Sequence, residues 1–124
     1  MSSDNRPTIW IGSSLDDLKA FPREVQSEIG TSLREAQEGK KPRNAKPMDG
    51  SKGATVMKIV ADHDGDTFRA VYTVRFTEAV YVLHCFQKKS KSGIATPRHE
   101  IELVMQRLKR AEQVHKQWQE RKSP

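Results

Sequence analysis

The feature that most constrains the fold of this chain is a group of three strand-like runs between residues 54 and 89. They read TVMKIVAD, TFRAVYTVRF and AVYVLHCFQKK, and each is rich in β-branched and aromatic residues. Asp64-Gly65 joins the first two, and this dipeptide is a strong signal for a two-residue hairpin turn. Thr77-Glu78 joins the second and third, although neither residue readily adopts positive φ. The chain therefore predicts an antiparallel sheet at its centre.

Helical patterns flank this sheet. Ser14 and Asp17 approximate a capping box, and the short helix that follows should stop at Phe21-Pro22. Gly39 is well placed just past the end of a second helix. Apolar residues at helical spacing predict that second helix (Val25, Ile29, Leu33 and Ala36) and a core-packed C-terminal helix (Ile101, Val104, Leu108, Ala111, His115 and Trp118).

Together these patterns predict an α+β fold, with an N-terminal helical hairpin, a small antiparallel β-sheet of about three to four strands and a C-terminal helix. The 124 residues suffice for one domain with one core. We divide the chain into an N-terminal segment (1–13), the helical hairpin (14–39), a basic loop (40–53), the antiparallel sheet (54–89) and the C-terminal helix (97–120). The loop assignment rests on the Pro, Gly and Lys content of KKPRNAKPMDGSKG.

Strand alternation allows the two faces of the sheet to be assigned. With two-residue turns, Lys58 lies opposite Val71, and Val71 lies opposite His84. The next row consists of Val60, Arg69 and Phe86. In the row after that, Lys88 lies opposite Thr67. One face is then free of charge and should be the core: Met57, Ile59, Phe68, Ala70, Tyr72, Val74, Phe76, Tyr81, Leu83 and Cys85. The opposite face mixes apolar and cationic residues: Val56, Val60, Val71, Val80, Val82, Lys58, Arg69, Arg75, His84, Phe86 and Lys88.

That mixed face predicts a groove suited to a stacked base and its phosphate. The alternative is that Lys58 and Arg69 only pair with acidic residues on the terminal helices.

The charge distribution also favours an anionic partner. The chain has a net charge of +6, and residues 1–39 carry four basic and seven acidic side chains, whereas residues 40–124 carry eighteen and nine. Such asymmetry is typical of proteins that bind nucleic acid or anionic membranes. No apolar run approaches the roughly 18 residues of a membrane helix and no secretory leader is seen, so we expect a cytoplasmic protein without a membrane partner. The single cysteine, Cys85, agrees with a reducing compartment.

The densest cationic stretch is HCFQKKSKSGIATPR, from His84 to Arg98. Lys88, Lys89, Lys91 and Arg98 stand in it without an acidic residue. Many basic runs are solvated loops, but this one continues from the strand that carries His84 and Phe86. We therefore expect it to contact phosphate.

Metal and cofactor motifs are weak or absent. Asp62, Asp64 and Asp66 alternate as a calcium loop begins, but Gly65 is the fourth loop residue instead of the sixth and Thr73 stands where a bidentate Glu is required. The four histidines and one cysteine lack zinc-ligand spacing. The chain has no nucleophile elbow, glycine-rich phosphate loop or dinucleotide fingerprint, so we expect no metal and no cofactor.

The order of these elements resembles the phage-derived HigB-like branch of the RelE/ParE toxins of type II toxin–antitoxin systems. The resemblance is carried by Phe68-Arg69 with Tyr72, by VLHCFQKKS over residues 82–90, and by Thr96-Pro97. It implies a RelE-like ribonuclease that cuts mRNA in the ribosomal decoding site and inhibits translation. It also implies a helix-turn-helix antitoxin partner that could form a hetero-oligomer with the toxin.

The resemblance also implies roles for individual residues. Relatives are thought to drive attack by a ribose 2′-hydroxyl on the neighbouring phosphate. Arg69 would stabilise the phosphorane, Lys88 and Lys89 would supply positive charge or a proton, and His84 would transfer a proton near neutral pH. The residues expected to bind RNA are Lys58, Arg75, Phe86, Lys91 and Arg98, with Phe86 stacking on a base.

One departure affects these roles. Many relatives have an acidic residue near Lys58, so a carboxylate base in that strand is in doubt here. Two other functions also fit the sequence. The chain could act without catalysis by binding a protein target, as ParE-type relatives bind DNA gyrase, or it could be a degenerate toxin retained for regulation.

Overall fold

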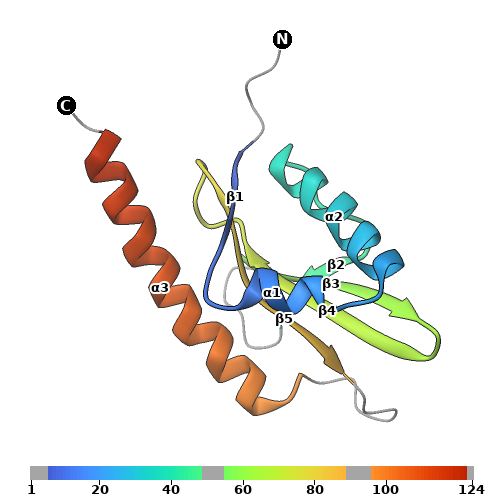
Figure 1. Cartoon of the computed structure of the whole chain (residues 1–124). Coiled ribbons are helices and arrows are strands. Elements are labelled where there is room, and N and C mark those ends of the chain that lie inside the picture. Colours follow the sequence, from blue (N-terminus) through green and yellow to red (C-terminus); the bar gives the residue numbers. More distant parts are fainter. Residues whose placement is uncertain (1–5, 49–54, 89–95, 123–124) are drawn as a thin grey trace.

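The computed structural model describes residues 6–48, 55–88 and 96–122 (Figure 1). They form, in chain order, β1 (Thr8–Trp10), α1 (Ser14–Lys19), α2 (Arg23–Gln37), β2 (Ala45–Pro47), β3 (Val56–His63), β4 (Asp66–Thr73), β5 (Val80–Lys88) and α3 (Arg98–Lys122). In this part of the chain, no helix is long and apolar enough to cross a membrane.

The sheet has five strands in the order β1-β5-β4-β3-β2. β1 runs parallel to β5, and the other neighbouring strands are antiparallel. The expectation of a three-to-four-strand antiparallel sheet was therefore wrong. Both added strands have three residues and lie at the sheet edges, in segments predicted to be non-regular. Three residues are too short to show a period-2 pattern, and their pairing depends on partners distant in sequence.

The β3–β4 hairpin forms as predicted. Asp64 and Gly65 have φ values of 51° and 84°, which a two-residue turn of this kind requires, and His63 pairs with Asp66. The predicted rows are confirmed on both sides of β4: Lys58 with Val71 and His84, Val60 with Arg69 and Phe86, and Thr67 with Lys88.

The connection between β4 and β5 differs from its prediction. It spans residues 74–79, and the β4–β5 register shifts between Val71 and Tyr72, which leaves Leu83 as an extra residue in β5. Beyond this bulge the faces of β5 are exchanged, because a shift of one residue turns every following side chain to the other side. Tyr81 and Leu83 therefore leave the predicted core face, and Val80 and Val82 join it.

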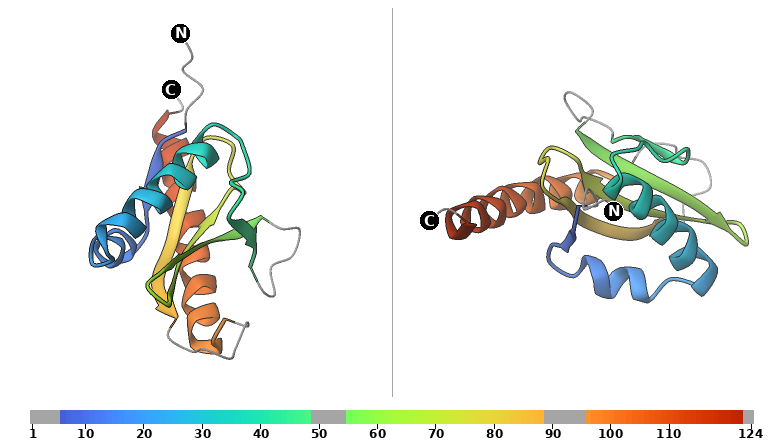
Figure 2. Two further views of the ribbon diagram at one scale, coloured as in Figure 1. Left: turned by 90° about the vertical axis from the view of Figure 1, so that its right-hand side faces the viewer. Right: turned by 90° about the horizontal axis from the view of Figure 1, so that it is seen from above.

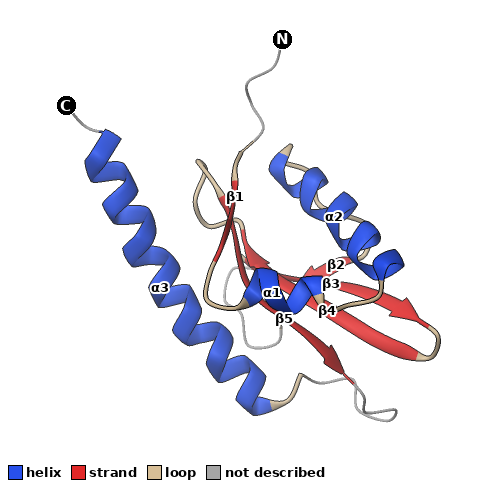
Figure 3. Ribbon diagram, in the orientation of Figure 1, coloured by secondary structure: helices blue, strands red, loops and turns tan. Residues whose placement is uncertain are grey.

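Helices cover both faces of the sheet (Figures 2 and 3). One core holds α2 residues such as Ile29 and Leu33 together with Ile59 and Ala70 of the sheet. A second core lies under α3 on the opposite face, where Val104 and Ala111 pack with other residues of the sheet. The apolar stripe predicted for the C-terminal helix is confirmed as this contact, and the face predicted to be an open groove is a second core.

The N-terminal helices form a short helical region over the sheet instead of a hairpin packed on itself, because α1 contacts β5 and α2 contacts β3. Ser13, not Ser14, precedes α1, and the Ser14 hydroxyl donates to the carbonyl of Val82 at 3.2 Å. Gly39 ends α2 as predicted. Its φ is 84°, and the next amide, of Lys40, donates back to the carbonyl of Glu35 at 2.9 Å.

Candidate functional site

The confirmed strand register brings five predicted site residues onto one face of β3, β4 and β5. They are Lys58, Arg69, His84, Phe86 and Lys88, and we call them the cationic cluster. Each exposes only 6–7% of its surface. Sequence reasoning therefore identified the neighbours correctly but not their environment, since charged side chains were expected in an open groove.

Arg69 is the least satisfied member of the cationic cluster. Its Nη1 donates a 3.3 Å hydrogen bond to the hydroxyl of Thr96, whereas its Nε is buried without a hydrogen-bond partner in the described structure. An unpaired buried donor costs about 1–3 kcal/mol, and more when the group is charged. The guanidinium therefore has an unused donor directed into a buried site.

His84 is held at both ring nitrogens by α3. Its Nε2 lies 2.6 Å from Oε1 of Glu100, and its Nδ1 lies 3.3 Å from Nη1 of Arg107. An arginine can only donate, so Nδ1 must be the acceptor and Nε2 carries the proton that is donated to Glu100. The Phe86 ring stacks on His84 with centroids 5.0 Å apart and an interplanar angle of 20°.

Arg107 also ties α3 to the rest of the fold. Besides approaching His84, it donates to the carbonyl of Leu83 at 3.0 Å and to the hydroxyl of Ser13 at 3.1 Å. Gly12 makes this approach possible: its φ is 60°, and a Cβ atom there would lie 2.8 Å from Nε of Arg107. Arg107 therefore joins α3 to β5 and to the turn between β1 and α1.

The remaining predicted residues lie elsewhere. Arg75 forms an ion pair with Glu112 of α3, and Arg98 is exposed and lies 3.8 Å from Glu102. Lys89 and Lys91 lie outside the described residues. The alternative that Lys58 and Arg69 pair with acidic residues of the terminal helices does not describe Arg69, whose hydrogen-bond partner is the Thr96 hydroxyl. Arg75 and His84 are the residues bonded to acidic side chains of α3, Glu112 and Glu100.

Sequence reasoning missed three residues that contact the cationic cluster: Thr96, Glu100 and Arg107. All three come from α3 or the residues just before it, and α3 was predicted only as an apolar stripe. The available signal was helical spacing, because residues 100 and 107 are seven positions apart and therefore lie on one side of a helix.

A second histidine, His115, belongs to the C-terminal half of α3 and exposes 8% of its surface. Its Nδ1 lies 2.9 Å from the Tyr81 hydroxyl and its Nε2 lies 3.0 Å from Oε1 of Glu78. Phe76 packs on the imidazole with ring centroids 4.3 Å apart, and Trp118 meets it edge-on. We call His115, Tyr81, Glu78, Phe76 and Trp118 the aromatic cluster.

Two pKa values in the aromatic cluster depart from their ordinary values. Desolvation favours a higher pKa for Glu78, but a hydrogen bond to its own backbone and the hydrogen bond and charge of His115 outweigh it and hold the carboxyl pKa below 4.5. Burial, together with the charge of Glu78, raises the pKa of Tyr81. Tyr81 therefore stays a neutral phenol that is hydrogen-bonded to His115.

The metal-ligating side chains and the cysteine of the described residues form no further candidate site. Across residues 6–48, 55–88 and 96–122, no three His, Cys, Asp or Glu side chains gather as metal ligands would. Cys85 is buried, and that burial raises the pKa of its thiol to about 12. The thiol is therefore protonated and unreactive in the folded protein.

Comparison with protein families identifies the chain. Residues 16–109 match the model of the family described as phage derived protein Gp49-like (DUF891). The chain belongs to this Gp49-like family. The family is toxin-like and related to the RelE/ParE toxin superfamily, which is consistent with a toxin of a toxin–antitoxin system. The match spans α2, all strands from β2 to β5 and the first half of α3, so it includes every described residue of the cationic cluster. A search of curated proteins found no match.

Proposed function

We propose that this Gp49-like protein is the toxin of a type II toxin–antitoxin system, of the HigB-like branch, and a metal-independent endoribonuclease that cleaves mRNA on the ribosome and inhibits translation. The observation that carries the proposal is the cationic cluster, in which Arg69, His84 and Lys88 lie on neighbouring strands and the Nε of Arg69 has no hydrogen-bond partner among the described residues. Membership of a toxin-like family supports it.

The chemistry we propose is attack by a ribose 2′-hydroxyl on its neighbouring phosphate. The transition state carries extra negative charge on the phosphate oxygens, which a guanidinium stabilises well because its planar fork can donate two parallel hydrogen bonds. In Arg69 the Nε is already buried and unused. We assign Arg69 to the phosphate, and Lys88, with Lys89, to charge stabilisation or to protonation of the leaving 5′ oxygen.

His84 is our candidate base. Its bond to Glu100 keeps the proton on Nε2 and leaves the lone pair on Nδ1. Arg107 occupies that lone pair through a long 3.3 Å contact, which a 2′-hydroxyl at about 2.8 Å would improve upon. Glu100 would then orient the ring and stabilise the imidazolium that forms, so it acts as a positioning residue.

RNA must displace protein contacts to reach this face, because the whole cationic cluster is buried. The groups that RNA would replace are themselves polar: Thr96 on Arg69, and Arg107 on His84. Such an exchange trades one hydrogen bond for another, and the phosphate adds a charge-assisted bond to Arg69. We therefore propose that the start of α3 separates from β5 when RNA binds. The base expected to stack on Phe86 would enter by the same route.

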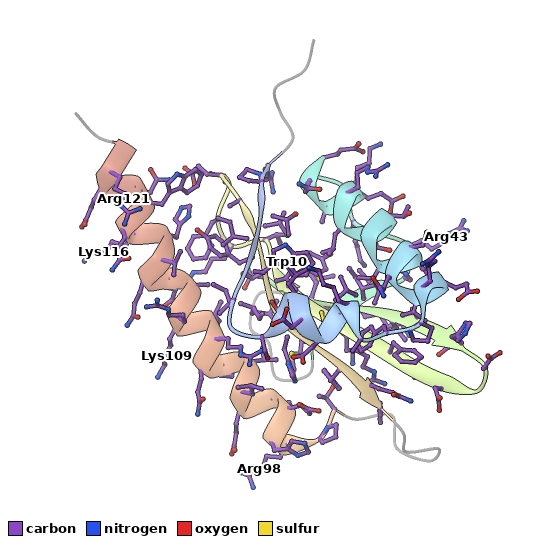
Figure 4. The ribbon with its side chains drawn as sticks, viewed as in Figure 1. Trp10, Arg43, Arg98, Lys109, Lys116 and Arg121 are labelled. Atoms are coloured by element: carbon purple, nitrogen blue, oxygen red, sulfur yellow. The ribbon has the colours of Figure 1, made fainter. Side chains whose placement is uncertain are left out.

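Ribosome association is supported by the outer face of α3. Figure 4 shows Arg98, Lys109, Lys116 and Arg121 along this helix, and all four are exposed. Exposed cations attract a phosphate backbone over about a Debye length, near 10 Å at 0.1 M salt, and so accelerate encounter. We also propose that RNA contacts the four other predicted basic residues, Lys58, Arg75, Lys91 and Arg98.

The partners we propose are the ribosome with its mRNA and a helix-turn-helix antitoxin produced with the toxin in the cytoplasm. The antitoxin would form a hetero-oligomer with the toxin and keep the cationic cluster covered until the antitoxin is degraded. A segment with acidic and apolar residues would suit this task, because it complements a basic and partly apolar protein surface.

The test is controlled induction of the wild type, Arg69→Lys, an Arg69→Ala/Lys88→Ala double variant and Arg34→Ala. Arg34 is an exposed arginine of α2, on the other side of the sheet, and serves as the matched control. Growth is followed, and 5′ ends are mapped on translated messages. We expect growth arrest with new cuts inside codons for the wild type and Arg34→Ala. Both should be lost in the double variant and strongly reduced in Arg69→Lys, which keeps the charge but loses the fork.

Two outcomes would overturn the proposal. Arrest with intact mRNA would favour the alternative in which the scaffold binds a protein target such as DNA gyrase. The burial of the cationic cluster is the observation that favours this alternative. Absence of arrest by a folded wild type would favour a degenerate regulatory homologue. Circular dichroism of each variant separates loss of activity from loss of folding.

A further inference from the structure

A cleft on the α2 side of the sheet has no role in the proposed ribonuclease. It has a volume of about 410 Å³, which is within the usual range for ligand sites, and lies where α2 ends above the strands. Its apolar wall includes Met57, Val74 and Pro47, and Arg6, Lys40 and Lys41 supply its charge. This side is opposite to the cationic cluster, since Met57 and Tyr72 pack in the core under α2.

Two local features of the fold bring Arg6, Lys40 and Lys41 to the same cleft. Gln37, the last residue of α2, holds the start of the chain through two hydrogen bonds, from the Arg6 amide to its carbonyl at 3.1 Å and from its side-chain amide to the Arg6 carbonyl at 2.6 Å. The positive φ of Gly39 then reverses the chain, so that Lys40 and Lys41 follow the helix end directly.

These charges are mostly uncompensated in the described structure. Lys40 has one carboxylate within 4 Å, that of Glu38 at 3.4 Å, whereas Arg6 and Lys41 form no ion pair with any described residue. The cleft lining contains no acidic residue among those described. The electrostatic potential of the cleft therefore favours an anionic ligand.

The hydroxyl of Tyr72 supplies the second observation. Tyr72 exposes 1% of its surface and lines the cleft, yet its hydroxyl forms no hydrogen bond with the described residues. Burial raises the pKa of this phenol to about 12, so it is a neutral donor at physiological pH. A ligand in the cleft can therefore accept a hydrogen bond from this hydroxyl.

The shape beyond the cleft favours an elongated ligand. A second hollow of about 630 Å³ shares Lys40 and Lys41 with the first and continues past Arg43 and Asn44 along α2. Glu28 and Glu35 line this second hollow. Their carboxylates would repel nearby anionic groups but can accept hydrogen bonds from backbone amides. The second hollow therefore suits a part of a peptide without acidic side chains, whereas a nucleic acid carries a phosphate at every nucleotide.

We propose that the cleft binds an acidic peptide segment of a partner protein, which inserts an apolar side chain between Met57, Val74 and Pro47 and places its carboxylates on Arg6, Lys40 and Lys41. The peptide backbone accepts the Tyr72 hydrogen bond and extends into the second hollow. This inference goes beyond the proposed ribonuclease, because it concerns the opposite face of the sheet and requires no RNA chemistry.

The test is an NMR titration of the full-length, isotope-labelled protein with a defined probe. The probe is the blocked peptide Asp-Glu-Phe-Asp-Glu-Leu-Ser-Gly, and its counterpart has lysine at every acidic position. The variants are Lys41→Glu in the cleft and Lys116→Glu on the outer face of α3. Both replace one exposed lysine and change the net charge equally, so only position differs. A third variant, Tyr72→Phe, removes only the hydroxyl.

We expect the acidic peptide to shift signals around Tyr72 and Lys41, and the basic peptide to shift none. Lys41→Glu should weaken binding about tenfold, Tyr72→Phe about threefold, and Lys116→Glu less than about twofold. Unchanged spectra elsewhere would show that each variant is folded.

Three results would overturn the inference. Equal weakening by Lys41→Glu and Lys116→Glu would mean diffuse charge attraction without a site. Tighter binding of an RNA hexamer to the same residues would make the cleft a nucleic-acid site. Absence of peptide binding at millimolar concentration to the folded wild type would remove the site. None of these readouts depends on mRNA cleavage, so the inference and the proposed function can fail separately.

Discussion

His84 of β5 and His115 of α3 both lie between this helix and the sheet, are buried to a similar extent and each have Nε2 bonded to a glutamate, yet their surroundings differ. His115 lies among Tyr81, Phe76 and Trp118, which enclose its ring. His84 lies in the cationic cluster, beside an arginine whose Nε has no partner in the part of the chain that the structure describes. Burial and a carboxylate partner therefore do not distinguish a structural histidine from a candidate catalytic one, whereas the satisfaction of the neighbouring groups does.

The largest effect on stability is expected for His115→Ala. The change leaves a cavity against Phe76 and removes the hydrogen-bond partner of the buried Tyr81 hydroxyl, so the free energy of unfolding should fall by about 2–4 kcal/mol. Urea unfolding followed by circular dichroism measures this change. His99→Ala is the matched control because His99 is exposed on the same helix, and its effect should stay within about 0.5 kcal/mol. A similar small effect for His115→Ala would remove the structural role.

A smaller loss of stability and a larger loss of activity are expected for His84→Ala. The change removes a hydrogen bond to the partly buried carboxylate of Glu100, which should cost about 1–2 kcal/mol. If the proposed function is correct, mRNA cleavage disappears. The measurement is cleavage per folded molecule, compared with that of His115→Ala at a temperature where both are folded. Cleavage lost equally in both variants would contradict the division of roles between the two histidines.

Arg69→Met should abolish mRNA cleavage while leaving the free energy of unfolding almost unchanged. Methionine fills a similar volume and removes a buried guanidinium with an unused donor, so the free energy of unfolding should change by less than about 1 kcal/mol or rise slightly. Cleavage should be lost. Thermal unfolding and the mapping of mRNA ends give the two readouts. Destabilisation by more than about 2 kcal/mol would instead make Arg69 a structural residue.

The smallest effect is a pH dependence in the aromatic cluster. Because the folded state holds the Glu78 pKa below 4.5, Glu78 contributes stability above that pH, and the contribution is lost as the pH falls through the folded pKa. Glu78→Gln should therefore lower the melting temperature slightly at pH 6, and the difference should vanish in more acidic solution. Gln113→Ala, an exposed uncharged change on α3, should give a curve parallel to that of the wild type. Parallel curves for Glu78→Gln would remove the role of its ion pair with His115.

The central part of the fold could be predicted because its signals are local. Asp64-Gly65 sets the β3–β4 hairpin and hence which residues of β3 and β4 are opposite one another. The spacing of apolar residues sets the buried stripe of α3. The same register places Arg69 beside Phe86, so the sequence predicts the residues of the cationic cluster.

The first half of β5 could not be predicted in the same way. Val80, Tyr81, Val82 and Leu83 are all apolar, so either face satisfies the hydrophobic pattern, and the alternation that would reveal a bulge is absent. The structure resolves the ambiguity because both faces of the sheet are covered, and the bulge at Leu83 divides these side chains between the two cores.

By itself the sequence determined the central antiparallel strands, the helix that crosses their second face, and the set of residues in the cationic cluster. Each of these depends on local spacing, which is fixed by backbone periodicity. Only the tertiary structure decided that a parallel strand joins β5, that α3 buries the cationic cluster, and that Glu100 and Arg107 fix the tautomer of His84. These contacts join segments distant along the chain, and their energy comes from packing and hydrogen bonding that no local pattern encodes.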